Sequence, residues 1–498
     1  MNESVWLPLL VIASSLIPGV IIFALAERRV KLRTTLNLCG ALLKMALVGA
    51  MLWGVYHGQH YEVRLALLPQ LELVLRADAL SLLFVTLSSV LWLVTTVYAI
   101  GYLEGSPNRS RFFGFFSLCV TATVGLALAG NLITFLIFYE LLTLATYPLI
   151  MHRGTEASRR AGKIYLRYTM AGGALLLVAI IWLYTLSGTL EFTPQGFLDG
   201  IDEQHHPALI IIFVLLIAGL GVKAALVPLH GWLPEAMVAP APVSALLHAV
   251  AVVKAGAFGI IRVVYDVFGV DFATLLGVTG PLVIVAAITI VYGSLRALFQ
   301  DDLKRRLAYS TVSQVAYITL GVAIAGPIAA VGGMVHLVHQ GLMKITLFFC
   351  AGNLAETLGI HKVSEMNGVG RRMPWTMAAF TVGVFGMIGA PPVAGFISKW
   401  YLGMGALEMD QGWLILVLAA SSLLNAAYFL PILYAAWFCE PSGPWPEERN
   451  FGRKETAWAL LLPPVVTALL ALAVGLLALA PFTPLAWVEF VVQREFVP

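Results

Sequence analysis

Long apolar runs, separated by short polar segments, recur from one end of the chain to the other. A run of about 20 apolar residues can cross the hydrocarbon core of a membrane as a helix. By this criterion the pattern predicts about fourteen membrane spans. They lie near residues 5–26, 35–56, 79–101, 112–129, 131–151, 165–187, 207–230, 242–265, 274–297, 307–325, 328–354, 376–402, 411–438 and 457–480. The expected fold is an all-α polytopic membrane protein, in which a single membrane domain covers residues 1–498.

Two other segments have patterns of their own. Residues 61–75 alternate polar and apolar side chains, which predicts a short β-hairpin rather than a span. Residues 301–306 (DDLKRR) are charged, and we interpret them as a solvated cap of the span at 307–325. The first four residues lack the basic segment of a signal peptide, so we expect the first apolar run to be a retained span.

The composition supports a location in the lipid bilayer. Hydrophobic residues make up 60% of the chain and charged residues 11%, and the mean hydropathy is +0.89. A soluble domain carries about 25% charged residues, so the polar surface here is too scarce for a water-soluble protein of this length. The net charge is only +3 and the basic residues are spread over short loops, which argues against a nucleic-acid partner.

The sequence shows no motif for a cofactor or a metal. Its four cysteines stand alone without a CxxC pair, and GxGxxG, GxxxxGK and HExxH are all absent. We therefore expect no cofactor, no metal site and no redox or hydrolytic site in this chain. Whether the chain serves an enzyme complex as a subunit is left open.

Basic residues follow the odd-numbered spans. They are Arg28, Arg29, Lys31 and Arg33 after the first span, Arg153, Arg159, Arg160, Lys163 and Arg167 after the fifth, Arg296, Lys304, Arg305 and Arg306 after the ninth, and Lys362, Arg371 and Arg372 after the eleventh. Loops after even-numbered spans are neutral or acidic, with Arg262 as a mild exception. The positive-inside rule then predicts that both termini lie on the outer side of the membrane.

Two predicted spans are interrupted by proline. Pro228 lies in the seventh span, and Pro391 and Pro392 lie in the twelfth. Proline removes a backbone donor, and such breaks at membrane depth are tolerated where protein or a wet cavity meets the freed groups. The positions correspond if residues 112–265 and 274–438 are two five-helix repeats of opposite orientation, preceded by three spans in 1–111 and followed by one at 457–480. Paired broken helices of this kind indicate a transport site.

Ionisable residues within the spans are the candidate site. They are Glu140, Lys223, His248, Lys254, His336, His339, Lys344 and Lys399. Such residues are costly in a membrane and are usually functional. Lys223 is the natural partner of Glu140, and a buried lysine can load and release a proton, which arginine cannot do. We predict that the eight residues form a proton-transfer row. For Glu140 the alternative is a purely structural ion pair, and for His248 a structural role is equally open.

The histidines extend this row. Lys254 follows His248 by about 9 Å along a helix, which suits transfer through one or two waters. The i,i+3 spacing of His336 and His339 places both on one helical face, ahead of Lys344. Histidine titrates in the physiological range. Because no third ligand has suitable spacing, a relay is favoured over a metal site.

At these motifs the sequence resembles the antiporter-like subunits shared by respiratory complex I, Mrp-type cation/proton antiporters and membrane-bound hydrogenases. The resemblance rests on six segments in the family's order, at residues 138–141, 223–235, 241–248, 302–314, 336–352 and 389–396. It implies two inverted repeats around a hydrophilic axis. It assigns Glu140 and Lys223 as the first ion pair, Lys254 as the linker, and Lys344 to Lys399 as the exit route.

Within the family, the D-type subunits of Mrp antiporters and their relatives are the most similar type. Lys399 stands where one complex I subunit type carries glutamate, and Lys254 is absent from the type that has a long lateral helix. The resemblance implies neighbouring membrane subunits as partners and protons as the ion, with sodium as an open alternative. A stand-alone transporter for an organic solute and a scaffold subunit without conduction are the other hypotheses.

Overall fold

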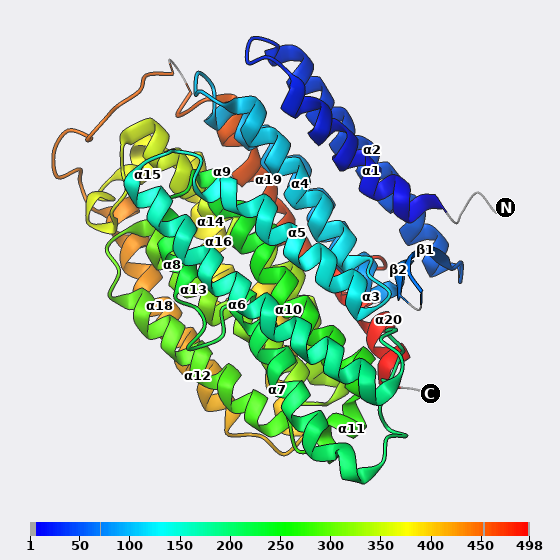
Figure 1. Cartoon of the computed structure of the whole chain (residues 1–498). Helices are drawn as coiled ribbons and strands as arrows, with labels where there is room; N and C mark the ends of the chain where they lie inside the picture. The colour runs from blue at the N-terminus through cyan, green and yellow to red at the C-terminus, as the bar shows by residue number, and fades with distance from the viewer. Residues whose placement is uncertain (1–5, 70, 452–453, 497–498) are drawn as a thin grey trace.

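The computed structural model describes residues 6–69, 71–451 and 454–496, and it is a bundle of long helices (Figure 1). Residues 1–4, on which the prediction of a retained first span rests, lie outside this range. The longer helices are α1 (Leu7–Ala24), α2 (Val30–Tyr56), α3 (Ala79–Tyr102), α4 (Arg109–Ala127), α5 (Leu132–Ile150), α6 (Glu156–Ser187), α7 (His206–Lys223), α12 (Thr279–Leu298), α13 (Leu303–Ala323), α14 (Pro327–Leu358), α16 (Pro374–Ile388), α17 (Ala394–Glu408), α18 (Leu414–Phe438) and α19 (Trp458–Leu476).

Shorter elements connect these helices. The span predicted at 242–265 is a continuous helical segment made of α9 (Ala241–Ala245), the π-helix η4 (Leu246–Val250), α10 (Val252–Arg262) and the π-helix η5 (Val263–Phe268). The remaining helices are η2 (Glu203–His205), α8 (Trp232–Glu235), η3 (Ala236–Val238), α11 (Val270–Leu275), η6 (Val363–Glu365), α15 (Val369–Arg372) and α20 (Pro484–Phe496).

Twelve helical segments of the described residues are long and apolar enough to cross a membrane. They match twelve of the fourteen predicted spans. The predicted span at 307–325 is helix α13, whose polar residues make it too hydrophilic to be counted among the twelve. The predicted span at 376–402 is divided into two shorter helices, α16 and α17. The chain is therefore a multi-span helical membrane protein, and the count of fourteen stays a prediction.

The core of the bundle is formed by α14 and by the segment 241–268. The most apolar stretch of each is fully buried. Helix α14 contacts α3, α13, α16, α17 and α19. Helix α13 is buried from Arg306 to Ala323 and lies between α12 and α14. Its polar side chains are thus enclosed by other helices rather than by lipid, which explains how a helix of low hydropathy can belong to a membrane domain.

The predicted hairpin is confirmed. Strands β1 (Tyr61–Leu68) and β2 (Leu71–Ala77) pair antiparallel, with Tyr61 opposite Ala77. The predicted cap is present, because the Asp302 side chain accepts a hydrogen bond from the Arg305 backbone N–H at the start of α13. The segment is only partly solvated, since Arg306 is buried and donates to the Tyr428 carbonyl at 2.7 Å.

Helix α20 was not predicted. It contains 13 residues, too few for the span criterion, and it packs against α3 and α14. The Trp487 indole donates to the Ala79 carbonyl at 2.8 Å, which ties α20 to the start of α3.

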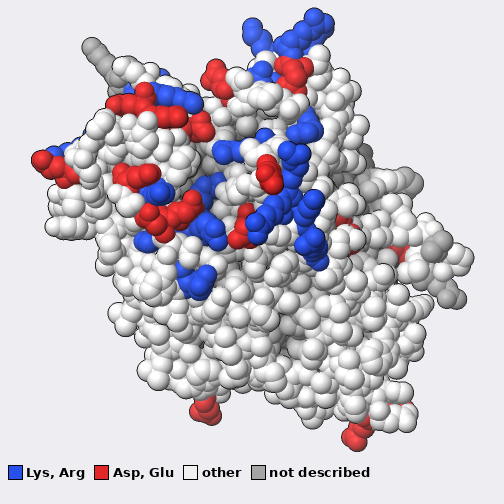
Figure 2. Space-filling model, turned by 60° about the vertical axis from the view of Figure 1, so that its left-hand side comes forward, with Lys and Arg blue, Asp and Glu red and all other residues white. Residues whose placement is uncertain are grey.

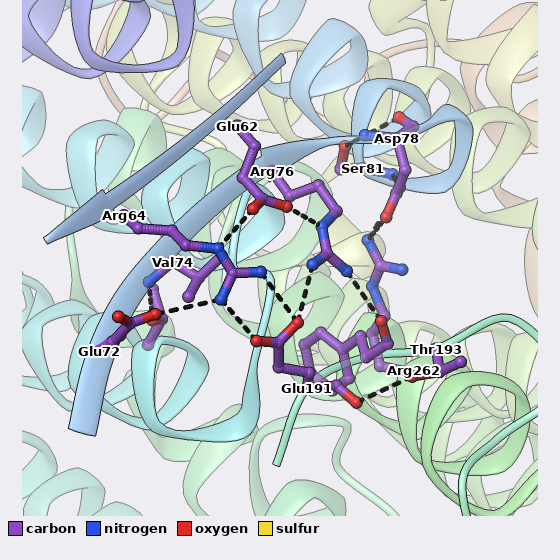
Figure 3. A network of polar contacts seen from close by, with 12 residues as sticks. Glu62, Arg64, Glu72, Val74, Arg76, Asp78, Ser81, Glu191, Thr193 and Arg262 are labelled. Atoms are coloured by element: carbon purple, nitrogen blue, oxygen red, sulfur yellow. Dashed lines mark hydrogen bonds and ion pairs between the residues drawn. The ribbon is translucent and has the colours of Figure 1, made fainter. Parts of the chain in front are cut away.

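A polar network attaches the hairpin to the segment after α6 (Figure 3). Arg64 donates to both carboxylate oxygens of Glu191, at 2.6 and 3.0 Å, and Arg76 donates to Glu62 and Glu191 at 2.6 and 3.0 Å. Hydrogen bonds from Arg64, and then from Arg76, hold the pKa of Glu191 below its usual range. Burial raises the pKa of Glu62, but hydrogen bonds from Arg76 and Arg64 outweigh it, so that pKa is also lowered.

We expect acid to loosen this attachment. Because both carboxyl pKa values are lowered in the folded protein, their contribution to stability is complete above the unfolded value of about 4.3 and is lost as pH falls through the folded values. Hydrogen exchange of residues 61–77, corrected for intrinsic rates, should therefore be faster below about pH 4 than at pH 7. In Arg64→Gln the difference between the two pH values should shrink; an unchanged difference would contradict this explanation.

Candidate functional site

Six of the eight sequence-predicted site residues have no solvent exposure at all. They are Lys223, His248, Lys254, His336, His339 and Lys344. The other two, Glu140 and Lys399, are half-buried. They come from α5, α7, η4, α10, α14 and α17, so the fold brings residues that are far apart in sequence into the interior of one bundle.

The break in the seventh predicted span is present and places Lys223 at the end of a helix. Helix α7 ends at this residue, Ala225 follows with a φ of 56°, and the Val227–Pro228 peptide is cis. The Lys223 ammonium donates to the Tyr139 carbonyl of α5 and lies 3.3 Å from the centroid of the Tyr139 ring. A cation at a helix C-terminus is favoured by the free carbonyl groups of the last turn.

Glu140 and Lys223 do not form the expected ion pair by direct contact, although they lie near enough for their charges to interact. Among the described residues, Glu140 has no ion pair, and its Oε1 atom is buried without a hydrogen-bond partner. Adjacent helical residues point about 100° apart, so Tyr139 faces α7 while Glu140 faces α6. There it lies against Gly173, where the missing side chain leaves room for the carboxylate.

His248 and Lys254 contact different turns of α14. The His248 ring lies 4.5 Å from that of Phe348, and neither of its nitrogens has a hydrogen-bond partner within the described part of the chain. The Lys254 ammonium donates to the Leu337 carbonyl at 2.8 Å. The π-helix η4 carries His248, and its wider turn closes with a bond from the Ala251 N–H to the Leu246 carbonyl. The two residues are thus not hydrogen-bonded to each other.

Helix α14 supplies three residues to the interior. His336 Nδ1 is 2.7 Å from Ser398 Oγ of α17. Both ring nitrogens of His339 lack a hydrogen-bond partner in the described residues, and Lys344 donates to Ser310 Oγ of α13. The i,i+3 spacing therefore does not give the two histidines a common protein partner.

The second predicted break is also present. Helix α16 ends at Ile388, Gly389 has a φ of 91°, and α17 begins at Ala394 after a cis Pro391–Pro392 peptide. Lys399 Nζ donates to the Met387 and Ile388 carbonyls at 3.1 and 2.8 Å. It therefore satisfies the free carbonyl end of α16, as a cation at a helix C-terminus does.

Sequence reasoning missed a further buried lysine, Lys44 of α2. The signal was available, because this residue stands alone in the apolar run at 35–56. The sequence reasoning also considered Arg262 only as an exception to the pattern of loop charges. In the structure Arg262 is buried and forms ion pairs with Asp78 at 2.8 Å and Asp266 at 2.7 Å. Within the described residues, no three His, Cys, Asp or Glu side chains are grouped as a metal site would require.

Known proteins are similar to this chain in sequence and in fold. The family described as NADH:quinone oxidoreductase/Mrp antiporter, TM matches residues 129–425, more than half of the chain, and the family described as NADH-Ubiquinone oxidoreductase (complex I), chain 5 N-terminus matches residues 69–113. The chain is 36% identical over 421 residues to the N subunit of the NADH-quinone oxidoreductase of Desulforudis audaxviator, covering 82% of each. It is 30% identical over 408 residues to the D-type subunit of the Na(+)/H(+) antiporter of Bacillus subtilis, covering 81% of this chain and 80% of that one.

Other curated relatives are longer, and the chain spans 63% of one and 54% of another. Among solved structures, a chain of the Mrp complex from Dietzia sp. DQ12-45-1b has the same fold, with a TM-score of 0.87, 23% identity and coverage of 100% of this chain and 98% of that one. The family match covers more than half of this chain, and the identities of 30% and 36% extend over most of two relatives. This chain therefore belongs to the family of antiporter-like membrane subunits found in NADH:quinone oxidoreductases and Mrp antiporters.

Proposed function

We propose that this chain translocates protons across the membrane as one subunit of a larger complex, either an Mrp-type cation/proton antiporter or a redox-driven complex related to complex I and the hydrogenases. The observation that carries the proposal is the complete burial of Lys223, Lys254 and Lys344, none of which has an ion pair with a described carboxylate. An isolated buried ammonium costs several kcal/mol, so these amines have an accessible neutral form.

The proposed route follows the eight residues from one half of the chain to the other. It runs from Glu140 and Lys223 through His248 and Lys254 to α14, and from there to Lys399. Their contacts are to backbone carbonyls and hydroxyls rather than to one another, so water is required between them. The unpartnered nitrogens of His248 and His339 are groups that such water would satisfy.

We further propose the two inverted five-helix repeats at 112–265 and 274–438. The two helix breaks support them, because each places a lysine at the carbonyl end of a helix. The orientation with both termini outside a bacterial inner membrane rests on the loop charges. In its support, Figure 2 shows Lys and Arg gathered toward one end of the visible face, above a broad uncharged surface.

Coupling has to come from neighbouring membrane subunits, since the chain has no redox motif of its own. The Bacillus subtilis relative is named as part of a Na(+)/H(+) antiporter, which supports protons, and sodium as the exchanged ion, for this chain. The assignment to the D type of Mrp antiporter subunits remains part of the proposal, beside the higher identity to the N subunit of the Desulforudis audaxviator oxidoreductase.

The decisive experiment is Lys223→Ala in the intact complex, reconstituted in liposomes. We expect normal assembly and a loss of proton translocation of about a hundredfold, the scale of a removed proton-transfer group. Lys223→Arg should be equally inactive, because arginine keeps its proton. Lys163→Ala, at an exposed lysine of α6, is the control. Full translocation in a normally assembled Lys223→Ala complex would refute the proposal and favour the scaffold hypothesis.

A further inference from the structure

Lys44 is a buried lysine outside the proposed row and outside both proposed repeats. It lies near the middle of α2 and has no solvent exposure. Its ammonium donates to Ser15 Oγ of α1 at 2.7 Å and lies 5.1 Å from the ring centroid of Trp92 of α3. Among the described residues it has no ion pair. An amine in this setting has the same physical character as Lys223 and Lys254.

A chain of polar groups leads away from Lys44 along α1, α2 and α4. Ser15 Oγ is 2.8 Å from Thr121 Oγ1, whose hydroxyl donates to the Ser117 carbonyl at 2.9 Å. The Ser117 hydroxyl in turn donates to Asn37 Oδ1 at 3.5 Å. We name Ser15, Thr121, Ser117 and Asn37 the N-terminal polar track. All four side chains are buried, and the Asn37 amide nitrogen has no hydrogen-bond partner in the described residues.

The track ends near water. Arg33, one helical turn from Asn37, donates to Ser110 Oγ at 2.9 Å and to the Glu27 carbonyl at 3.4 Å. The Glu27 side chain is 47% exposed, and its carboxylate accepts bonds from the Arg109 and Ser110 backbone N–H groups. Polar side chains therefore lie at intervals from mid-membrane to the surface at the start of α2 and α4, and water has to bridge the step from Asn37 to Arg33.

Small residues hold the three helices close enough for this track to form. A Cβ atom at Gly40 would lie 2.7 Å from the Ser14 carbonyl oxygen, and one at Gly19 would lie 2.9 Å from the Ser117 Cβ atom. Glycine at such positions lets membrane helices approach closely, so hydroxyl groups on neighbouring helices can reach one another. The helices that carry the track are therefore packed closely at these two positions.

Helix α3 separates Lys44 from the central row. It contacts α2 on one side and η4 and α14 on the other. Its Trp92 lies over Lys44, and one turn away Ser88 donates to the Val250 carbonyl at 3.4 Å, at the end of the π-helix that carries His248. The Trp92 indole nitrogen is buried without a hydrogen-bond partner in the described residues. These polar groups on α3 lie between the two lysine-bearing regions.

We propose that Lys44 is a further proton-carrying residue, which takes protons from the surface at Glu27 through the N-terminal polar track and delivers them past Trp92 toward His248. In the step itself the ammonium gives one proton to a water on the His248 side and becomes a neutral amine, and a proton arriving along the track restores it. No electron transfer or co-reactant is needed. This inference rests on the proposed function.

The test uses Lys44→Met and Lys44→Arg in the intact complex, reconstituted in liposomes beside Lys223→Ala. We expect both Lys44 variants to assemble and to translocate protons about tenfold more slowly, since methionine has no titratable group and arginine does not release its proton. A normal rate in Lys44→Met, or rescue of both assembly and rate by Lys44→Arg, would show that Lys44 is only structural. A normal rate in Lys44→Met beside an inactive Lys223→Ala complex would refute the inference on Lys44 and leave the proposed function standing.

A second variant addresses the track without touching the lysine. Thr121→Val keeps the side-chain shape and removes the hydroxyl that contacts Ser15, so the rate should fall several-fold. The matched control is Ser89→Ala on α3, whose buried hydroxyl bonds only within its own helix, to the Val85 carbonyl at 2.7 Å. If neither Lys44 variant assembles, Thr121→Val decides: equal rates in Thr121→Val and Ser89→Ala would overturn the proposal.

Discussion

Replacing Arg262 by alanine is expected to lower the free energy of unfolding by roughly 3–5 kcal/mol, the effect of removing one partner of a buried ion pair. Arg262 is 3% exposed and donates to Asp266 and to both carboxylate oxygens of Asp78. Its loss leaves Asp78 and the buried Asp266 without the cation that both of them contact. We expect the purified variant to unfold at a clearly lower temperature in detergent and to accumulate poorly in the membrane.

A double variant separates charge from packing. In Arg262→Met combined with Asp266→Asn the buried negative charge is removed together with the arginine. Asp78 is 25% exposed and keeps its bond from the Ser81 N–H at the start of α3, so it can stay ionised. Most of the lost stability should return, because a buried ion pair replaced as a whole costs little. A double variant as unstable as Arg262→Ala would show that packing of the guanidinium, against Phe192 and Phe258, is the main contribution.

Replacing Gly256 by alanine is expected to disturb both stability and proton translocation. A Cβ atom at this position of α10 would lie 2.7 Å from the Leu220 carbonyl oxygen and 2.8 Å from the Lys223 carbonyl carbon. Both are backbone atoms at the end of α7 and cannot turn aside, so α10 and α7 must move apart. Overpacking of this kind costs about 1–3 kcal/mol or more. The displacement also separates Lys223 from Lys254. We therefore expect both the translocation rate and the melting temperature of the variant to be lower than those of the parent.

Gly49→Ala is the matched control. Gly49 lies inside α2, and nothing would lie within 4 Å of its added Cβ atom. Alanine is preferred over glycine in a helix by about 1 kcal/mol, so this variant should be as stable as the parent or more so. If Gly256→Ala matched Gly49→Ala in melting temperature and in the rate of proton translocation, the close approach of α10 to α7 would be unimportant for both.

The sequence by itself determined the elements that depend on local patterns. Apolar runs located twelve helical spans, alternation over residues 61–75 located the hairpin, and proline located both helix breaks. These features follow from hydropathy and backbone chemistry over a few neighbouring residues. The same runs marked the ionisable residues that the fold buries, because a charge in an apolar span is visible without any tertiary information.

Two elements show where hydropathy alone is a poor guide. Helix α20 is too short to qualify as a span, and only its packing against α3 and α14 shows where it belongs. Helix α13 was predicted as a span although its polar residues give it a low hydropathy, and its place is decided by the helices that enclose it. Hydropathy describes transfer from water to lipid, so it cannot describe a helix whose surroundings are other helices.

Partner choice was decided only by the tertiary structure. The sequence suggests an ion pair between Glu140 and Lys223. On helix α5, however, Glu140 points toward Gly173, and the Lys223 ammonium donates to the carbonyl of the preceding residue, Tyr139. Arg262 finds Asp78, which is 184 residues away along the chain. A sequence fixes which groups need partners, because burial makes an unpaired charge costly. Which partner each group reaches depends on the rotation and crossing of whole helices, and those are set by packing across the entire bundle.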